Sequence, residues 1–326
     1  MKVYNIGIIG CGTIAARMAK TLNGMKGVNC YAVASRSMDK AKAFAQEWHF
    51  QKAYGSYEEL VEDENTDLIY IATPHSQHYK NARLCIMHKK PVLCEKPFMP
   101  NASQAEELFR LAEENHTFIT EAIWTRYMPS AAKLRQLLDS GIIGTPFTLS
   151  ANLSYPISQK DRIRQPELGG GALLDIGIYT LNFAAMAFGS DVESTHSACQ
   201  LIDTGVDAQE SITLFYKDGK MATLQSSVYA KSDRLGVISG DKGHIIVENI
   251  NNPEKIRVVD SNYKTVAEYE FLSEQITGFE YEVQACMEAI ENGWLESPYM
   301  PHEETLRIIR QMDSLRKEWG VVYPFE

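Results

Sequence analysis

The sequence lacks paired cysteines, an excess of basic residues and a long uninterrupted apolar run. Its six cysteines include no CxxC pair, so we expect neither a metal cluster nor a disulfide framework, and a reducing, cytoplasmic compartment fits. Lys and Arg number 32 against 42 Asp and Glu, and this net charge of −10 argues against nucleic acid as a partner. Nowhere do 18 apolar residues run together, and the first residues carry no pattern typical of a signal peptide, so no membrane segment is expected.

The first 121 residues alternate short apolar runs with amphipathic stretches. The apolar runs predict strands at 3–9, 29–34, 68–72, 91–94 and 118–121. Helices are predicted between them at 14–22, 38–48, 57–61, 77–88 and 103–115, the last with a capping signature of Ser103 and Glu106. This alternation is typical of a doubly wound parallel sheet with helices on both faces, so we predict a Rossmann domain over 1–121.

The pattern changes in the rest of the chain, which we assign to a second domain over 122–326. Residues 147–155 alternate strictly between apolar and small polar side chains, which predicts a strand with one buried face. Further strands are expected at 194–201, 209–216, 220–228, 234–239, 244–249 and 255–260, with a hairpin turn at Asp218-Gly219, and helices at 130–140, 174–187, 275–292 and 302–319. We therefore predict an α+β domain with a large open, mostly antiparallel sheet. The last helix of this domain can pack near the first domain.

A glycine turn joins the first predicted strand to the first predicted helix. In Gly10-x-Gly12-x-x-Ala15 the glycines allow a tight turn and a close backbone approach, and the alanine is small where helix meets strand. The N–H groups that open the helix, at Thr13, Ile14 and Ala15, favour the pyrophosphate of a dinucleotide. The alternative is an ordinary glycine turn.

The residue that ends the second strand decides between the two nicotinamide cofactors. An NAD enzyme places Asp or Glu there, about 20 residues after the glycine turn, to bind the ribose 2′-hydroxyl. Here Ser35 stands at that position, followed by Arg36 and Ser37, with Lys40 one turn later. Hydroxyls and a guanidinium suit a 2′-phosphate, so we expect NADP rather than NAD. The alternative is that Arg36 is a solvated loop charge.

The third and fourth predicted strands end in residues that can reach a bound cofactor. Ala72-Thr73-Pro74-His75 closes the third strand, and Glu95-Lys96 closes the fourth. Ligands of open α/β sheets bind outside the carboxyl ends of the strands, so we predict that these residues and His78 line the cofactor site. His75 and His78 are three residues apart but have no third ligand nearby, and we expect no metal.

A glycine-rich stretch precedes the helix predicted at 174–187. Gly169-Gly170-Gly171 lets the backbone approach a neighbour closely, and the helix carries Asp175 and Tyr179 four residues apart on one face. A carboxylate and a phenol placed in this way are a candidate proton-transfer pair. The alternative is an aspartate at the helix start and a tyrosine of the core.

Four motifs in this order resemble the glucose-fructose oxidoreductase / inositol dehydrogenase / rhizopine catabolism (Gfo/Idh/MocA) family. They are Gly-Cys-Gly-Thr-Ile-Ala at 10–15, Ile-Ala-Thr-Pro-His at 71–75, Glu-Lys-Pro at 95–97 and the stretch 169–179. The resemblance implies a Rossmann domain followed by an α/β domain, with a catalytic lysine at Lys96 and an aspartate at Asp175. Where the family has a histidine this chain has Tyr179, as in the dihydrodiol dehydrogenase and xylose dehydrogenase branch, in which Tyr is the expected acid/base and NADP the general cofactor.

The stretches 121–126 and 162–168 are similar to that branch too. We therefore expect Arg126 at the cofactor. We expect Trp124, as a flat apolar wall, and Arg162 at the substrate, together with Asp175 and Tyr179.

These observations predict an NADP-dependent oxidoreductase that moves a hydride between the nicotinamide and a CH–OH group of a sugar, polyol or cyclic diol. In this hypothesis Tyr179 moves the hydroxyl proton, Lys96 holds the oxygen and favours the phenolate, and Asp175 orients the pair. Two alternatives stay open, namely a non-catalytic NADP-binding sensor and a glycosidase that recycles its nicotinamide.

One face of the strand predicted at 147–155 is polar but made of small residues, Thr148, Ser150, Asn152 and Ser154. No later segment is an obvious cover for it, and relatives bury such a face against a second copy. We therefore predict an isologous homodimer through the open sheet. The alternative is a solvated face, which antiparallel sheets tolerate.

Overall fold

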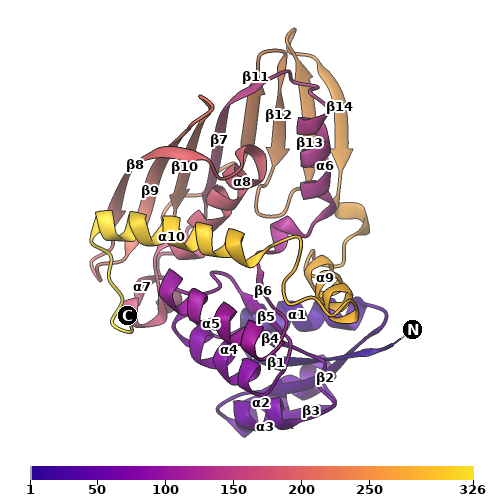
Figure 1. The fold of residues 1–326 in the computed structure, drawn as a ribbon. Coiled ribbons are helices and arrows are strands. Elements are labelled where there is room, and N and C mark those ends of the chain that lie inside the picture. Colours follow the sequence, from indigo (N-terminus) through magenta and orange to yellow (C-terminus); the bar gives the residue numbers. More distant parts are fainter. Residues whose placement is uncertain (1) are drawn as a thin grey trace. The chain divides into compact units, whose positions relative to one another are not determined.

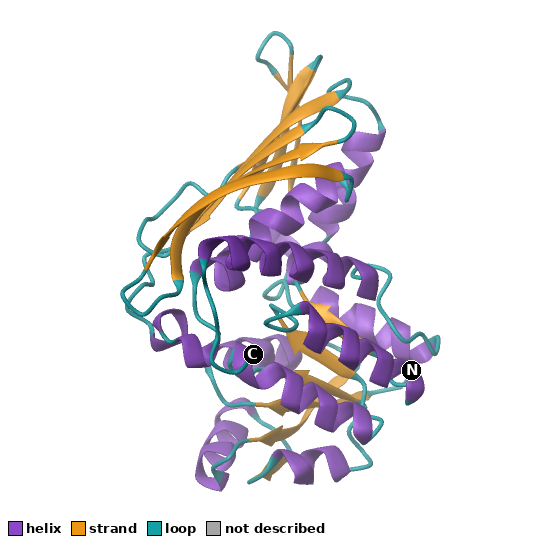
Figure 2. Ribbon diagram, turned by 60° about the vertical axis from the view of Figure 1, so that its left-hand side comes forward, coloured by secondary structure: helices purple, strands orange, loops and turns teal. Residues whose placement is uncertain are grey.

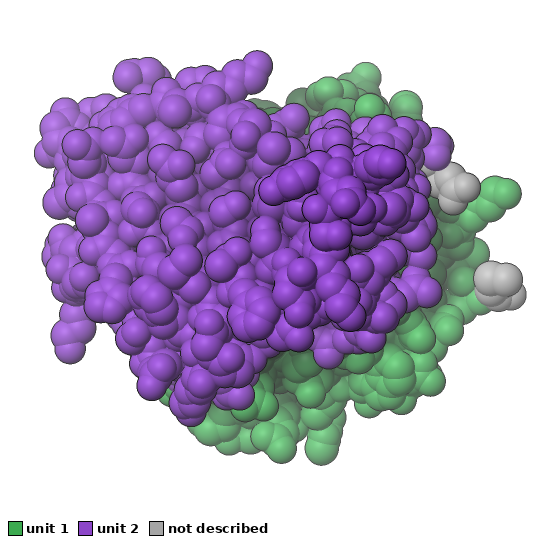
Figure 3. All heavy atoms as spheres, turned by 90° about the horizontal axis from the view of Figure 1, so that it is seen from above, with its two compact units in different colours: residues 1–127, 275–309 green, residues 128–274, 310–326 purple. Residues whose placement is uncertain are grey.

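The computed structural model describes residues 2–326, and the chain divides into two compact units (Figure 3). Unit 1 comprises Met1–Tyr127 and Gln275–Ile309, and unit 2 comprises Met128–Glu274 and Arg310–Glu326. Both units are therefore discontinuous, whereas the sequence predicted one boundary after residue 121. The segment 275–309 belongs to unit 1 because its residues bond there: Ile119 donates its N–H to the Leu295 carbonyl at 3.1 Å, and the hydroxyls of Thr21 and Thr277 are 2.5 Å apart.

Unit 1 is built on a parallel sheet of six strands in the order β3-β2-β1-β4-β5-β6. The strands are β1 (Tyr4–Ile9), β2 (Val28–Ala34), β3 (Lys52–Tyr54), β4 (Leu68–Ile71), β5 (Val92–Glu95) and β6 (Ile119–Ala122). The helices are α1 (Thr13–Gly24), α2 (Met38–Trp48), α3 (Tyr57–Glu62), α4 (His78–Met87), α5 (Ala102–Glu114) and α9 (Glu280–Glu291). Helices flank this sheet on both faces (Figure 2), which confirms the predicted Rossmann arrangement.

Three local features of unit 1 differ from the predictions. The short strand β3 was not predicted. Helix α5 is capped by Asn101, whose side chain accepts the N–H of Gln104 at 3.0 Å, and not by Ser103. Helix α9 begins at Glu280 rather than at residue 275, because the Glu280 carboxylate accepts the N–H groups of residues 276, 277 and 278 at 2.7, 3.1 and 2.8 Å and holds them as a loop.

Unit 2 contains an eight-stranded sheet in the order β14-β13-β12-β11-β7-β10-β9-β8. The strands are β7 (Pro146–Ser154), β8 (Val192–Leu201), β9 (Asp207–Tyr216), β10 (Met221–Ser227), β11 (Gly236–Gly240), β12 (Gly243–Glu248), β13 (Lys255–Asp260) and β14 (Thr265–Glu270). Only β7 and β10 pair in parallel, so the predicted large, mostly antiparallel sheet is confirmed. The helices are α6 (Pro129–Asp139), α7 (Asp161–Arg164), α8 (Ile178–Phe188) and the second half of α10 (His302–Trp319), and α8 packs on β7 and β10 (Figure 1).

The strand β7 shows the predicted alternation over its middle part. Leu149, Ala151 and Leu153 are buried, while Thr148 and Ser150 are exposed on the other face. Both ends of the strand differ from the predicted alternation, because Phe147 is 48% exposed and Ser154 is buried. The main-chain N–H of Ser154 donates to the Ser232 hydroxyl at 3.0 Å. The strand β14 and the short helix α7 were not predicted, and the helix predicted at 174–187 opens with a π turn at Leu173–Gly177.

One described stretch, Pro166–Phe188, is long and apolar enough to cross a membrane by length and composition. The 18-residue window that meets this test is 83% buried inside the protein, as a core helix of a soluble protein is. This stretch is not an uninterrupted apolar run, so it agrees with the sequence observation above, and the expectation of no membrane segment stays a prediction.

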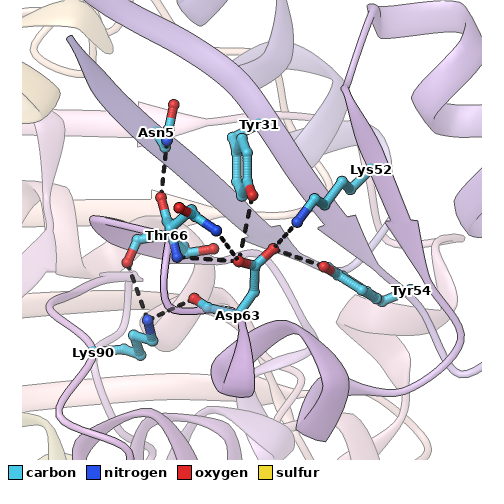
Figure 4. A network of polar contacts seen from close by, with 8 residues as sticks. Asn5, Tyr31, Lys52, Tyr54, Asp63, Thr66 and Lys90 are labelled. Carbon is cyan, nitrogen blue, oxygen red and sulfur yellow. Dashed lines mark hydrogen bonds and ion pairs between the residues drawn. The ribbon is translucent and has the colours of Figure 1, made fainter.

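A polar network around Asp63 joins β2, β3 and the end of α3 (Figure 4). Its carboxylate accepts from the Lys52 ammonium at 2.7 Å, from the Tyr54 hydroxyl at 2.7 Å and from the Tyr31 hydroxyl at 3.3 Å. The main-chain N–H of Asn65 donates to the same carboxylate at 3.0 Å. The side-chain amide of Asn65 donates to it as well, at 3.1 Å. The side chain of Asp63 is 5% exposed, so this edge of unit 1 is organised around one buried carboxylate with five donors.

Candidate active site

The glycine turn after β1 has the backbone geometry that a dinucleotide site needs. Gly10 has a φ of +109°, and a Cβ there would lie 2.8 Å from the carbonyl oxygen of Ala72. Any other residue would be strained at this position and would push against the end of β4. Gly12 is different, because a Cβ on it would meet no atom within 4 Å. The chain therefore leaves open space beside Gly12 at the start of α1.

The N-terminus of α1 fits a pyrophosphate. Gly12 is the N-cap residue of α1, no side chain caps the helix, and its first turn has no acidic residue. Thr13 is exposed, and Ala15 is fully buried where α1 packs on the sheet. Free N–H groups and the positive end of the helix dipole favour an anion here, so Gly10, Gly12 and the residues 13–15 would hold the cofactor phosphates.

The loop after β2 presents cationic and hydroxyl groups instead of a carboxylate. Arg36 is exposed, and the Ser37 hydroxyl caps α2 by accepting the N–H of Lys40 at 3.4 Å. Burial raises the pKa of Tyr57, and the charge of Arg36 acts on that pKa in the opposite direction. Tyr57 was not among the predicted site residues, because only the fold brings α3 beside this loop. The donor set fits a 2′-phosphate.

The loop after β4 carries Thr73 and His75, which are half-buried at the carboxyl edge of the sheet. His78 behaves differently from His75 because its side chain is fully buried. Its Nε2 lies 2.9 Å from the Thr73 carbonyl oxygen, and its Nδ1 lies 2.9 Å from that of Pro97. Burial lowers the pKa of His78. This ring therefore ties the loop after β4 to the loop after β5, and the predicted contact of His78 with the cofactor stays a prediction.

Lys96 lies directly after β5, at the same edge of the sheet as Thr73. Its main-chain N–H donates to the Glu95 carboxylate at 3.2 Å, and that carboxylate also accepts a short hydrogen bond from the Tyr70 hydroxyl. Burial raises the pKa of Glu95, while the positive charge of Lys96 acts in the opposite direction. Glu95 is thus turned into the protein, where it anchors the loop that presents Lys96.

A second buried carboxyl group supports the same loop. Glu121, at the end of β6, accepts the N–H of Phe98 at 2.9 Å. Burial raises the pKa of Glu121 to about 7, against the effect of that bond and of the Arg126 and Lys96 charges. The sequence contains no signal for this role, because Glu121 is 23 residues from the N–H that it binds.

Trp124 and Arg126 follow β6, and both side chains have partners inside unit 1. The Trp124 ring packs edge-on against Phe279 at 4.7 Å between centroids, and the Arg17 guanidinium lies 4.5 Å from its centroid. Arg126 forms a short ion pair with Glu304. Arg17, which was not a predicted site residue, and Phe279 therefore pack against the ring, and the apolar wall expected at Trp124 stays a prediction.

In unit 2 the predicted pair Asp175 and Tyr179 lies at the transition from the π turn to α8. Asp175 is inside the π turn, and Tyr179 is the second residue of α8. Arg162 of α7 donates to the Asp175 carboxylate at 2.5 Å, so the structure brings together two of the three predicted substrate residues of this unit. The two residues are four apart in sequence, and part of that interval is a π turn, which is wider than an α turn and is frequent at functional sites.

Two other features of the described residues bear on the site. A cavity of about 700 Å³ in unit 1 is lined by residues that include Phe109, Trp294 and His302. Leu295 of this cavity bonds the first residue of β6, so the cavity lies at the opposite edge of the sheet from Lys96. Between residues 2 and 326 no group of three or more His, Cys, Asp or Glu side chains is arranged to hold a metal ion.

The reversal of strand order between β1 and β4, with a glycine turn at that point, defines a dinucleotide-binding protein with a second, α+β unit. Residues 4–122 match the model described as an oxidoreductase family with an NAD-binding Rossmann fold, and residues 131–246 match the GFO/IDH/MocA C-terminal domain. The chain belongs to the GFO/IDH/MocA oxidoreductase family.

Relatives with assigned activities match along the full chain. Trans-1,2-dihydrobenzene-1,2-diol dehydrogenase of Xenopus tropicalis is 35% identical over 98% of both chains, and that of Mus musculus is 33% identical over 98% of this chain and 97% of its own. A 3-ketoreductase from Actinomadura kijaniata, solved with NADP and TDP-benzene, has a TM-score of 0.86 at 25% identity over 97% of this chain and 98% of its own. The protein is an NAD(P)-dependent dehydrogenase.

Proposed function

We propose that this protein is an NADP-dependent dehydrogenase that acts on a CH–OH group of a trans-diol, sugar or polyol. One observation supports this proposal most strongly. The uncapped start of α1, the Ser35-Arg36 pair and Lys96 all lie at the carboxyl edge of the parallel sheet of unit 1. The named activity of the Xenopus and mouse relatives supports a cyclic trans-diol as the first substrate to test.

In this proposal the bound nicotinamide supplies or accepts the hydride, and the chain moves the proton. Tyr179 takes the proton from the substrate hydroxyl in oxidation and returns it in reduction. Lys96 holds the substrate oxygen and favours the phenolate form of Tyr179. Asp175, fixed by Arg162, binds and orients the substrate hydroxyl groups.

A substrate screen tests the proposal. NADP is offered with trans-dihydrodiols, aldoses and inositols, and NADPH with the matching carbonyl compounds, while NADPH absorbance is followed. Turnover of at least one of these classes is expected. Tight NADP binding without any turnover would indicate a sensor. A cofactor that stays bound through gel filtration, together with glycoside cleavage, would indicate a nicotinamide-recycling glycosidase.

The Arg36→Ala variant is expected to bind NADP roughly 10- to 100-fold more weakly, the range for a hydrogen bond to a charged group. NAD binding is expected to stay nearly unchanged, because NAD lacks the 2′-phosphate. Lys42→Ala is the control, since it removes one exposed positive charge from α2 next to this loop. Titration of both cofactors against the three proteins measures the effect, and equal losses for NADP and NAD in Arg36→Ala would contradict it.

We also propose that the protein is an isologous homodimer through the open face of the unit 2 sheet. On this face Thr148 and Ser150 of β7 and Phe215 of β9 are exposed. Light scattering at micromolar concentration is expected to give twice the mass of the chain. Ser150→Arg is expected to shift the mass toward the monomer, because an isologous contact sets the added charge near its own copy. A wild-type monomer would refute the proposal.

A reducing compartment such as the cytoplasm is part of the same proposal. All six cysteines are free thiols, and four of them, Cys30, Cys85, Cys94 and Cys286, are buried. Burial raises the pKa of these thiols, which keeps them in the unreactive thiol form. Cell fractionation with an antibody to the protein tests the location.

A further inference from the structure

The turn of residues 169–171 leads into the π turn that carries Asp175, and neighbouring chain encloses it. A Cβ on Gly170 would lie 2.4 Å from the carbonyl oxygen of Ile163. A Cβ on Gly171, whose φ is +112°, would lie 2.3 Å from Oδ1 of Asp207. The turn therefore needs glycine for close packing inside unit 2, and the groups that hold it also set where the π turn begins.

Asp207, the first residue of β9, caps this helical segment from a distant part of the sequence. Its Oδ2 accepts the N–H of Leu173 at 2.5 Å. Asp207 is fully buried, and a carboxylate at the start of a helical segment satisfies N–H groups that have no partner within the helix. One side of the segment that carries Asp175 is thus fixed by the sheet.

The C-terminal residues hold the other side of the turn. The Tyr323 hydroxyl donates to the carbonyl oxygen of Gly170 at 2.6 Å, across 153 residues of sequence. Tyr323 is 1% exposed, so this bond is shielded from water. In Figure 1 the C-terminus lies beside α7, the helix that carries Arg162, the partner of Asp175.

Arg316 of α10 keeps the C-terminal residues in this position. Its guanidinium donates to the two carboxylate oxygens of Glu326 at 2.7 and 3.0 Å and to Asp313 at 2.8 Å. The same guanidinium lies 4.7 Å from the centroid of the Tyr323 ring. Because Arg316 is itself buried, these contacts fold the segment 321–326 back on α10 and direct the Tyr323 hydroxyl at Gly170.

We propose that the segment 321–326 positions the π turn and α8 for catalysis, with Tyr323 as the positioning residue. The Tyr323 hydroxyl fixes the position of the Gly170 carbonyl. The carbonyl in turn fixes the start of the segment that presents Asp175 and Tyr179. The inference rests on the function proposed above, since it gives those two side chains their roles in proton transfer.

The test is Tyr323→Phe, which keeps the ring and removes only the hydroxyl. We expect kcat to fall roughly 3- to 10-fold, the worth of one hydrogen bond, with the Kd of NADP unchanged. Tyr4→Phe is the matched control, because Tyr4 is also 1% exposed and its hydroxyl bonds a main-chain carbonyl, that of Met287, in unit 1. Glu326→Gln keeps the shape of the side chain that Arg316 binds but removes its negative charge, and this variant is also expected to lower kcat.

The double variant Tyr179→Phe with Tyr323→Phe separates positioning from general destabilisation. If Tyr323 acts through the helix of Tyr179, the second substitution costs almost nothing once the phenol at 179 is gone. Hydrogen exchange of the 169–179 amides is expected to speed up in Tyr323→Phe and to stay unchanged in Tyr4→Phe.

Two results have distinct meanings. Wild-type kcat in Tyr323→Phe, or unchanged exchange over 169–179, would overturn the positioning role while Tyr179→Phe still lowers kcat. Wild-type kcat in Tyr179→Phe itself would overturn the proposed function instead.

Discussion

Replacing Tyr179 with Phe is expected to lower kcat by about 10² to 10⁴ while NADP binding stays nearly intact. A phenol with a pKa of about 10 is a poor base at neutral pH, and a nearby ammonium shifts it toward the working range. Removal of a positioned acid/base typically costs this factor in rate. The alkaline-rising limb of the pH profile for oxidation is expected to disappear in the same variant. Steady-state kinetics and NADP titration measure both effects.

Lys96→Met is expected to cost as much as Tyr179→Phe, and the double variant little more than either. Groups that act as one unit are not additive, so this result would show that both act on the same substrate oxygen. Tyr4→Phe serves as the control for loss of a buried phenol outside the site. Wild-type kcat in Tyr179→Phe would mean that the acid/base is elsewhere, and His75 would be the next residue to test, since His78 is fully buried.

The parallel sheet of unit 1 could be predicted from sequence because its strands are buried on both faces. Apart from Asn5 and Glu95, the residues of β1, β4 and β5 are apolar or glycine, and a glycine, a proline or a charge follows each strand within three residues. β3 escaped prediction because it has three residues, none of them buried, and owes its place to pairing with β2. The glycine turn was found for a local reason, since Gly10 needs its positive φ within one short motif.

The candidate site was predictable where a motif presents a group, and not where distant residues hold it. Lys96 and Asp175 lie in recognisable motifs. Their supports are Glu121 for the loop of Lys96 and Asp207 with Tyr323 for the turn before Asp175. Each support acts across 23 or more residues, and a hydrogen bond at that distance leaves no periodic pattern in the sequence.

The three glycines at 169–171 illustrate the same limit. Their number predicts a close backbone approach, and the structure confirms one at Gly170 and Gly171. What they approach is the Ile163 carbonyl and the Asp207 carboxylate. The π turn that follows also leaves no pattern in the sequence. Its last residue, Gly177, packs against Glu210 of β9, and a Cβ there would lie 2.6 Å from the carboxylate oxygen, so the contact that requires glycine comes from a distant strand.

Asp63→Asn is expected to lower the free energy of unfolding of unit 1 by roughly 2–3 kcal/mol at pH 7, as for loss of a buried, multiply bonded carboxylate. Asn presents one acceptor oxygen where Asp63 receives five donors, so the hydroxyls of Tyr31 and Tyr54 compete for it (Figure 4). Lys52→Gln is expected to cost less, because the Lys52 side chain is 42% exposed and water can replace its partner. Asp218→Asn, which removes an exposed carboxylate paired with Lys220, is the control for a surface charge.

The pH dependence of this loss identifies its cause. The Lys52, Tyr54 and Asn65 bonds hold the pKa of Asp63 well below its usual range, against the opposing effect of burial. Stability from a carboxylate with a lowered folded-state pKa is fully present above its unfolded pKa of about 4 and is lost as the pH falls toward the folded value. The gap between wild type and Asp63→Asn is therefore expected to stay constant from about pH 7 to 5 and to shrink below about pH 4. Urea unfolding followed by circular dichroism at each pH measures it, and a gap that persists unchanged at low pH would mean that Asp63 stabilises the edge by packing and not by its charge.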